Sequence, residues 1–506
     1  MKKMVRRLLI IFLVFSLFIT SFSIYSKDTH KEIISKNSSD GITLTIVTRH
    51  DTTITNEFAS RFLATPEAIA LNITNIDFRQ ATTDDGWKKL LEDPSKSVDI
   101  AWGGGPALFD KMDKMGLLYH INPINDSELF TALNQSVPSG NMYVRLKSLS
   151  DTGDLIWAAN TISSYGFIVN HDFLDTYGLP IPSTWEELAT PTYFINNNVK
   201  ALAVADPPLS TTHTRIFQII LQAFGWEEGW RIITRMAANA DIYPSSVDLD
   251  ARASVVTGEV GICPSIDFYG VFAHRENPNC EYIIPEGESI LSGDPIALGA
   301  NVDDYEAAGA FIKYVSSPEG QATWLIPGID HLPVNNSAFT TPEGKEYIPM
   351  YEIFNNTLAA FTNIEQVIFN ETLAIITLDA SIYYFHETLT SPYSLLREAW
   401  GKMINGLRNE EINESEFVSL ANILTAPCLS LQQAIDLYLD FHTNPYFIEP
   451  YRSEWRACAK NRYNAVLDYF AAETTTPSNS SQIKTITFGI ITSIVTLLLI
   501  RKKKRN

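Results

Sequence analysis

Apolar and polar residues recur with two different periods along the first part of the chain. Residues 41–50 alternate at every second position and are rich in β-branched side chains, which predicts a strand. Residues 56–71 repeat their apolar positions at helical spacing. The same patterns then predict a strand at 73–79, a helix at 85–91, a buried strand within 97–106 and a helix at 107–115. This succession predicts an α/β fold with a mainly parallel sheet, in which ligands bind at the carboxyl ends of the strands.

A second α/β region begins near residue 200. The pattern predicts a strand at 200–205, helices at 213–223, 227–238 and 250–257, an apolar strand that ends near Asp267, strands within 285–300 and a helix at 303–315. From 342 to 470 the pattern is mostly helical and poor in turn residues. The chain therefore divides into two α/β regions and a helical region.

The N-terminal end has the composition of a signal peptide. Residues 1–26 place four basic residues before an apolar run and a polar exit. Ile24 and Tyr25 are larger than the residues that usually precede a cleavage site, so an uncleaved N-terminal anchor stays an alternative.

The C-terminal end predicts a membrane anchor. A Ser/Thr-rich stalk at 471–484 leads into an uncharged run at 485–500, which as a helix would span about 24 Å of a membrane core about 30 Å thick. The basic tail at 501–506 follows directly, whereas a lipid-anchor signal is apolar to its end. By the positive-inside rule we expect a single-pass protein of the cell membrane with an extracellular body and a cytoplasmic C-terminus.

The charge of the body excludes one class of partner. Ten of the 38 lysines and arginines lie in the two ends, so 28 remain in residues 27–481 against all 58 acids, a formal charge of −30. A body this acidic repels nucleic acid and anionic lipid surfaces, so we expect no nucleic-acid partner. The chain has 506 residues, of which 45% are hydrophobic, enough for a large core, so general disorder is also excluded.

Cysteines and glycosylation motifs agree with an extracellular body. Pairing of Cys263 with Cys280 and of Cys428 with Cys458 is the simplest of three disulfide connectivities, and no CxxC spacing points to a metal. The Asn-X-Ser/Thr motifs that predict a glycoprotein begin at Asn37, Asn72, Asn125, Asn134, Asn335, Asn355, Asn370, Asn413 and Asn479.

The first group of candidate ligand contacts follows the strand within 97–106. The amides of Gly103, Gly104 and Gly105 suit an anion, although a tight strand-to-helix turn explains the same glycines and no Lys-Ser/Thr follows to make a nucleotide loop. Trp102 beside them either stacks on a ligand or packs in the core.

The second group lies in the second α/β region. Ser210, Thr211 and Thr212 precede a helix, where they cap it, present amides and hydroxyls to an anion, or do both. Asp267 and Tyr269 end an apolar strand, where either ligand contact or a hinge hydrogen bond would compensate their burial.

Catalytic and cofactor motifs are missing from the sequence. No Ser-His-Asp order, HExxH motif or pair of catalytic carboxylates stands out, so we expect neither an enzyme nor a cofactor nor a bound metal.

Several short segments, in the same order along the chain, resemble a known family. They are Ser183-Thr-Trp-Glu-Glu-Leu188, Gln222-Ala-Phe-Gly-Trp226, Ile266-Asp-Phe-Tyr269, Gly293-Asp-Pro-Ile296 and Ser317-Pro-Glu-Gly-Gln321. They resemble the extracellular solute-binding proteins of ABC transporters, family 1, in the branch that includes the ferric-iron-type periplasmic binding proteins. The resemblance as a whole covers about 41 to 340.

The resemblance implies a two-lobed type II periplasmic-binding-protein fold that closes on a solute. Lobe one would comprise 41–140 with 268–340, lobe two 141–267, and 341–470 would form a helical extension. Carried over position by position, the cleft would draw on Trp102, Gly103, Gly104, Gly105, Tyr165, Ser210, Thr211, Thr212, Ser245, Ser246, Asp267 and Tyr269.

The resemblance leaves the ligand open. Iron-binding members carry an adjacent Tyr-Tyr pair, but here the only such pair is Tyr383-Tyr384 in the helical region, and Phe268 stands beside Tyr269. We therefore do not expect ferric iron bound in that way, and a small organic anion, a phosphonate, a polyamine or a thiamine-like solute stays open. The function expected is a membrane-anchored receptor that delivers a small solute to an ABC permease complex. A ligand-sensing or adhesive ectodomain is the alternative.

Overall fold

A computed structural model describes residues 41–81, 83–138, 144–243, 248–362, 366–443 and 448–474. The predicted signal peptide, transmembrane anchor and basic tail lie outside these ranges, as does the predicted stalk from residue 475. The stalk was expected to begin at 471, but residues 471–474 are the end of a helix, α20 (Glu449–Thr474). In the described ranges no helix is both long and apolar enough to cross a membrane.

The first sheet begins with three parallel strands. β1 (Ile42–Thr48) pairs with β2 (Ile73–Gln80) and β3 (Ile100–Trp102). β1 sends Leu44 and Ile46 into one hydrophobic core and Val47 into another, so it is covered on both faces, as parallel strands usually are. The helices around these strands are α2 (Thr52–Leu63), α3 (Pro66–Ala70), α4 (Asp84–Glu92), α5 (Pro106–Lys114) and α6 (Ser127–Ser136). The predicted order of strands and helices up to 115 is confirmed.

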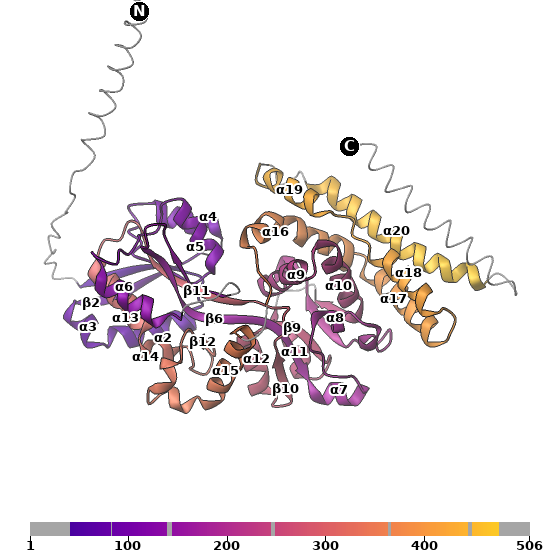
Figure 1. Cartoon of the computed structure of the whole chain (residues 1–506), viewed down its shortest axis with the longest axis horizontal. Helices are drawn as coiled ribbons and strands as arrows, with labels where there is room; N and C mark the ends of the chain where they lie inside the picture. Colours follow the sequence, from indigo (N-terminus) through magenta and orange to yellow (C-terminus); the bar gives the residue numbers. More distant parts are fainter. Residues whose placement is uncertain are drawn as a thin grey trace, which may run out of the picture. The chain divides into compact units, whose positions relative to one another are not determined.

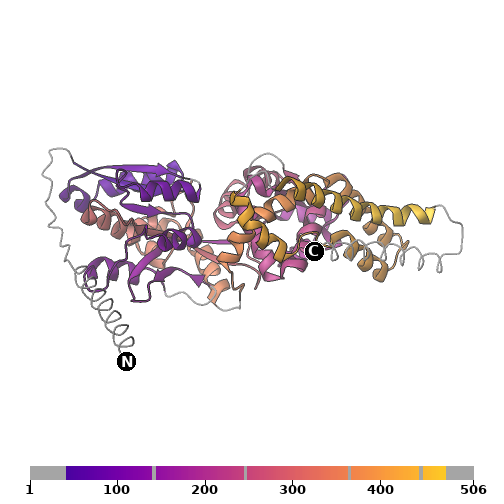
Figure 2. The same ribbon diagram turned by 90° about the horizontal axis from the view of Figure 1, so that it is seen from above.

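One long strand, β6 (Leu155–Asn170), belongs to both sheets (Figures 1 and 2). It pairs antiparallel with β11 (Leu291–Leu298) through its first half, and with β9 (Ile262–Ile266) and β10 (Cys280–Ile283) through its second. The expectation of a mainly parallel sheet is therefore wrong for the centre of the fold, where antiparallel pairs join the outer parallel strands. Short strands β4 (Val144–Arg145), β5 (Lys147–Leu149) and β12 (Leu332–Pro333) complete this centre.

The second sheet continues from β9 to β7 (Leu202–Ala205) and β8 (Ala240–Tyr243), which are parallel. β10 also belongs to this sheet, so the return to the first sheet comes at β11 and not at residue 268 as predicted. The helices of this region are α7 (His171–Tyr177), α8 (Trp185–Leu188), α9 (Thr211–Ala223), α10 (Trp226–Asn239), α11 (Asp248–Val256) and α12 (Asp267–Glu276). Helices α13 (Tyr305–Ser316) and α14 (Pro318–Thr323) follow β11.

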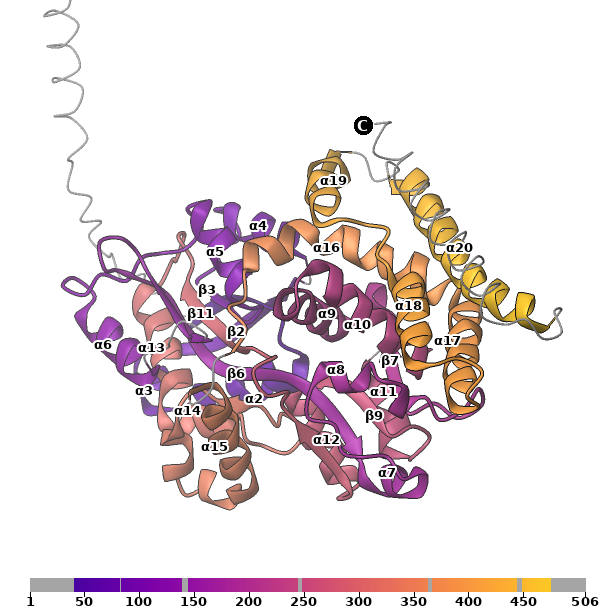
Figure 3. The ribbon, with the colours of Figure 1, turned by 45° about the vertical axis from the view of Figure 1, so that its right-hand side comes forward.

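Helix α15 (Ile348–Thr362) lies beside α14 and packs into the core of the first sheet through Met350, Phe354 and Phe361 (Figure 3). The helices from α16 onward share one hydrophobic core with the second sheet. They are α16 (Glu371–Phe385), the π-helix η5 (His386–Thr390), α17 (Tyr393–Arg408), α18 (Glu414–Thr425), α19 (Leu431–Thr443) and α20. In η5 the fully buried Glu387 forms ion pairs with Arg452 and Arg456 of α20. Paired in this way, a buried carboxylate links α20 to η5.

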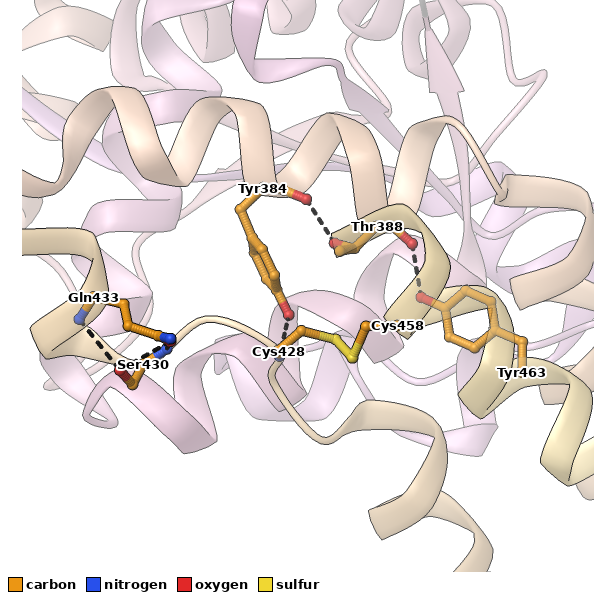
Figure 4. Close-up of a disulfide and its surroundings, with 7 residues drawn as sticks. All are labelled: Tyr384, Thr388, Cys428, Ser430, Gln433, Cys458 and Tyr463. Atoms are coloured by element: carbon orange, nitrogen blue, oxygen red, sulfur yellow. Dashed lines mark hydrogen bonds between the residues drawn. A yellow bond between two sulfur atoms is a disulfide. The ribbon is translucent and has the colours of Figure 1, made fainter. Parts of the chain in front are cut away.

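A disulfide links the segment between α18 and α19 to helix α20. Cys428 is bonded to Cys458 of α20, as predicted, and the Cys428 backbone N–H donates to the Tyr384 hydroxyl (Figure 4). Tyr384 packs against Trp230, so the Tyr383-Tyr384 pair belongs to the core of this region.

The predicted pairing of Cys263 with Cys280 is wrong. Cys263 lies opposite Ile168 on one side of β6, and Cys280 lies opposite Asn170 on its other side. Two strand spacings, roughly 10 Å, separate their backbones, whereas a disulfide requires Cα atoms within about 7 Å. Both thiols are buried and are not joined to each other.

Candidate functional site

A cavity of about 440 Å³ lies where the two sheets meet along β6. One wall carries Arg49, His50, Gly104, Gly105, Asp294 and His331, from the first sheet and its loops. The other carries Thr212, Arg215, Phe268 and Tyr269 from α9 and α12, with Tyr165 of β6 between the walls. Glu371, at the start of α16, completes the lining from the helical extension.

The glycine loop does hold a carboxylate with its backbone amides, but the carboxylate is the protein's own. The N–H groups of Gly104 and Gly105 donate to Oδ1 of Asp294, over 2.6 and 3.3 Å. Asp294 stands in β11, the strand that pairs with β3 just before the loop. The anion cradle expected from the sequence is therefore already occupied from the neighbouring strand.

Gly103 is required by a close approach. Its φ is +81°, and a Cβ at this position would lie 2.7 Å from Nε2 of His50. His50 is 7% exposed, and its Nε2 has no hydrogen-bond partner among the described residues. The nearest charged group is Oδ2 of Asp294, 3.7 Å away, and burial lowers the pKa of His50. A neutral imidazole thus borders the cavity with an unused ring nitrogen.

Trp102 is a core residue and does not line the cavity. Its side chain is fully buried, and Nε1 donates to Oδ1 of Asn160 over 3.3 Å. The ring packs against Phe58 and Trp324. Of the two interpretations of Trp102, packing is the one that the structure supports.

Ser210 caps helix α9. Its Oγ accepts the N–H of His213 over 2.9 Å, and the side chain is buried. Thr212, in the first turn of α9, lines the cavity wall. The side chain of Thr211 and all of Ser245 and Ser246, which were also candidates, lie outside the described residues.

Asp267 acts on the crossing strand. Its Oδ2 accepts the N–H of Ser164 over 2.7 Å, and the Ser164 carbonyl accepts the Tyr282 hydroxyl. Ser164 is the last β6 residue paired with β11, and β9 pairing begins at Tyr165, so side chains satisfy the backbone at this crossover. Burial raises the pKa of Asp267 to about 7. Asp267 is absent from the cavity lining, and its side chain instead makes a hydrogen bond to the strand that crosses between the sheets.

Arg215 and Glu371 are cavity residues that sequence reasoning missed. Nη1 of Arg215 donates to Oε2 of Glu371 over 2.8 Å, and Nη2 makes a second, parallel contact with Oε1. The guanidinium also lies over the ring of Phe369, 4.2 Å from its centroid. Arg215 lies one turn after the Ser-Thr-Thr segment, which is a local signal, but its partner is 156 residues away.

Other charges near the cavity are paired as well. Arg49 donates to Asp84 over 2.9 Å, and Lys111 contacts the same carboxylate. Burial raises the pKa of Tyr165 to about 12, so its phenol keeps the proton and remains a hydrogen-bond donor.

Aromatic rings form part of the wall. Phe268 stacks on His331 with ring centroids 4.4 Å apart, and Tyr269 lies beside Phe268. Burial lowers the pKa of His331 to about 4, so this ring is neutral at physiological pH. The cavity therefore combines aromatic faces with carboxylates and paired cations.

Solved structures with similar chains include a ferric binding protein and an ABC transporter structure. The ferric binding protein from Campylobacter jejuni is 17% identical, with a TM-score of 0.45 over 63% of this chain and 96% of that one. An ABC transporter structure from Clostridium perfringens is 16% identical, with a TM-score of 0.45 over 64% of this chain and 100% of that one.

Sequence comparisons give two further matches. The phosphoglycerate transport regulatory protein PgtC of Salmonella typhimurium is 27% identical over 191 residues, which are 38% of this chain and 45% of that protein. The chain thus matches just under half the length of this curated relative. The sequence profile of the bacterial extracellular solute-binding proteins matches residues 61–350, which include β6 and every cavity residue except Arg49, His50 and Glu371. The family expected from the sequence is confirmed: the chain belongs to the bacterial extracellular solute-binding proteins.

Proposed function

We propose that this protein is a membrane-anchored extracellular receptor that captures a small solute in the cavity between its two lobes and delivers it to an ABC transporter permease. The observation that carries the proposal is the cavity of about 440 Å³, whose walls come from both sheets and meet at the one strand the sheets share. A volume of this size suits a small molecule.

The mechanism we propose is hinge closure about β6. A solute that contacts both walls binds the closed form more tightly than the open form, and so shifts the equilibrium between them. The backbone at the crossover is bonded by side chains, which suits a hinge. Asp267 accepts the Ser164 N–H, and the Ser164 carbonyl accepts the Tyr282 hydroxyl. The Tyr165 carbonyl accepts the Ser289 hydroxyl.

The ends of the chain complete the proposal. The N-terminal basic and apolar run would direct export, and the uncharged run at 485–500 with its basic tail would tether the receptor. A tether holds the receptor at a high effective concentration near a permease in the same membrane.

Native mass spectrometry of the full-length protein, purified in mild detergent without denaturation, tests this function. We expect a bound small molecule, and a rise in melting temperature when that molecule is added back to stripped protein. The name of the Salmonella relative makes phosphoglycerate a necessary member of any solute panel. Absence of any bound or stabilising solute across broad amine, anion, sugar and peptide panels would contradict the proposal.

A further inference from the structure

The helical extension reaches the cavity through the segment that enters α16. We call residues 366–374 the strap. The Asn370 N–H donates to Oε1 of Gln222 over 2.7 Å, and Nε2 of Gln222 donates back to the Asn370 carbonyl. Nε2 of Gln218 donates to the Ala374 carbonyl over 2.7 Å, and Val367 is buried in a small core with Ile219. The strap is thus bound to α9 at several points, and these bonds fix its position.

The strap brings Glu371 onto Arg215. The two side chains are 25% and 19% exposed and make a bidentate pair, with Phe369 of the strap on the guanidinium face. A charged hydrogen-bonded pair of this kind is strong. To bind Arg215, a solute anion would have to displace the Glu371 carboxylate, which the strap holds in place.

The charge balance of the cavity then leaves one carboxylate without a counter-charge. Arg215 is paired with Glu371 and Arg49 with Asp84. Asp294 accepts only neutral amides and lies 3.7 Å from His50, whose pKa burial lowers. In the described part of the chain no lysine or arginine lies within ion-pair distance of Asp294. This carboxylate faces the cavity and is 26% exposed.

The aromatic part of the lining also suits a cation. Phe268, Tyr269 and Tyr165 present aromatic rings to the cavity, and the negative face of an aromatic ring attracts ammonium groups. The unused Nε2 of His50 stands beside Asp294 and is a further polar contact for the same group.

We propose that the cavity selects its solute by a positively charged group, which Asp294 receives, and that Glu371 sets this selectivity by keeping Arg215 from binding an anion. The solute class is therefore an amine, or a zwitterion bound through its amine. This inference rests on the proposed solute-binding function. Glu371 lies outside the residues shared with the family profile, so the selectivity belongs to the extension of this chain.

Two variants of the full-length protein, compared with the wild type, test the proposal by calorimetric titration with two probe sets. The amine set is putrescine, spermidine, choline and arginine, and the anion set is inorganic phosphate, citrate and 3-phosphoglycerate. For the wild type we expect the tightest amine to bind at least about tenfold more tightly than the tightest anion. Glu371→Gln should gain at least about tenfold in anion affinity, because Arg215 is released. Asp294→Asn should lose at least about tenfold in amine affinity, while its amide oxygen still accepts the loop N–H groups.

Two controls separate charge from folding. Glu371→Asp keeps the carboxylate and should keep the amine preference. The double variant Arg215→Gln with Glu371→Gln removes both charges and should gain no anion affinity. If Glu371→Gln melts far below the wild type, the double variant and Asp294→Asn still decide the outcome.

The outcomes separate a failure of this inference from a failure of the proposed solute-binding function. A wild type that prefers an anion, or a Glu371→Gln variant with unchanged anion affinity, overturns the inference and leaves the receptor intact. If no probe binds, the charge of the solute found by native mass spectrometry decides: a positive group supports the inference, and a solute without one overturns it. If no solute is found at all, the proposed function itself fails.

Discussion

Oδ2 of Asp267 accepts a hydrogen bond from the backbone N–H of Ser164, 2.7 Å away, where the crossing strand β6 leaves the first sheet. The carboxyl comes from the first residue of α12 and is 2% exposed. An N–H that no neighbouring strand pairs must find another partner when buried, and this side chain supplies it. The contact satisfies the backbone of β6 at the point where the strand passes from one sheet to the other.

Asp267 should make stability depend on pH. Its folded-state pKa is raised to about 7, so the folded protein retains a proton that the unfolded chain releases above about pH 4. Between these values the unfolding free energy should fall as pH rises. Asp267→Asn, whose amide oxygen still accepts the Ser164 N–H, should lose this slope. Urea unfolding at several pH values measures it, and identical pH profiles for variant and wild type would contradict the assignment.

Gly103 and Gly105 form a matched pair for the glycine loop. Both have φ of +81°, but a Cβ on Gly103 would clash with His50, whereas a Cβ on Gly105 meets nothing within 4 Å. Gly103→Ala should therefore cost roughly 1–3 kcal/mol more than the backbone strain that Gly105→Ala also pays. Denaturant melts of both variants give the difference. Equal losses would show that His50 can move aside without cost.

His386 should couple the extension to the second sheet in a pH-dependent way. Its Nδ1 lies 2.7 Å from Oδ2 of the buried Asp206, and this hydrogen bond raises the pKa of His386. The contribution is complete below the unfolded value near 6.5 and is lost as pH rises through the raised value. Hydrogen exchange of η5 should therefore quicken as the pH rises through that window, after correction for intrinsic rates. His386→Gln should lose this dependence, and an unchanged profile in the variant would count against the pair.

The disulfide should contribute substantially to stability. Cys428 and Cys458 are 30 residues apart, and closing a loop of that length stabilises by about 3–4 kcal/mol in the chain-entropy model. The double variant Cys428→Ser with Cys458→Ser should melt at a correspondingly lower temperature.

Alkylation checks the cysteine assignment independently. Unfolded, unreduced protein should take up two alkyl groups, at Cys263 and Cys280, and reduced protein should take up four. Four protected cysteines before reduction would show that the second pair also forms a disulfide.

The local pattern of side chains was enough to locate most strands and helices of the two α/β regions. The strand predicted at 41–50 contains β1, and the helix predicted at 213–223 is most of α9. Periodic apolar positions bury one face of an element whichever segment packs against it. The same pattern did not predict β6. Fourteen of its sixteen residues are buried, so its burial shows no alternation to separate a strand from a buried helix.

The site depended on contacts that no local pattern contains. The sequence left two interpretations of Gly103, Gly104 and Gly105, an anion cradle and a tight turn. The anion that Gly104 and Gly105 bind is Asp294, about 190 residues further along the chain. The partner of Arg215 likewise comes from the strap, 156 residues away. Periodicity and motif spacing report each residue's own surroundings along the chain, so they identified the loop, the helix start and the family. Only the tertiary structure decides that Asp294 accepts the loop amides and that Glu371 pairs with Arg215. These pairings determine the charge of the cavity lining.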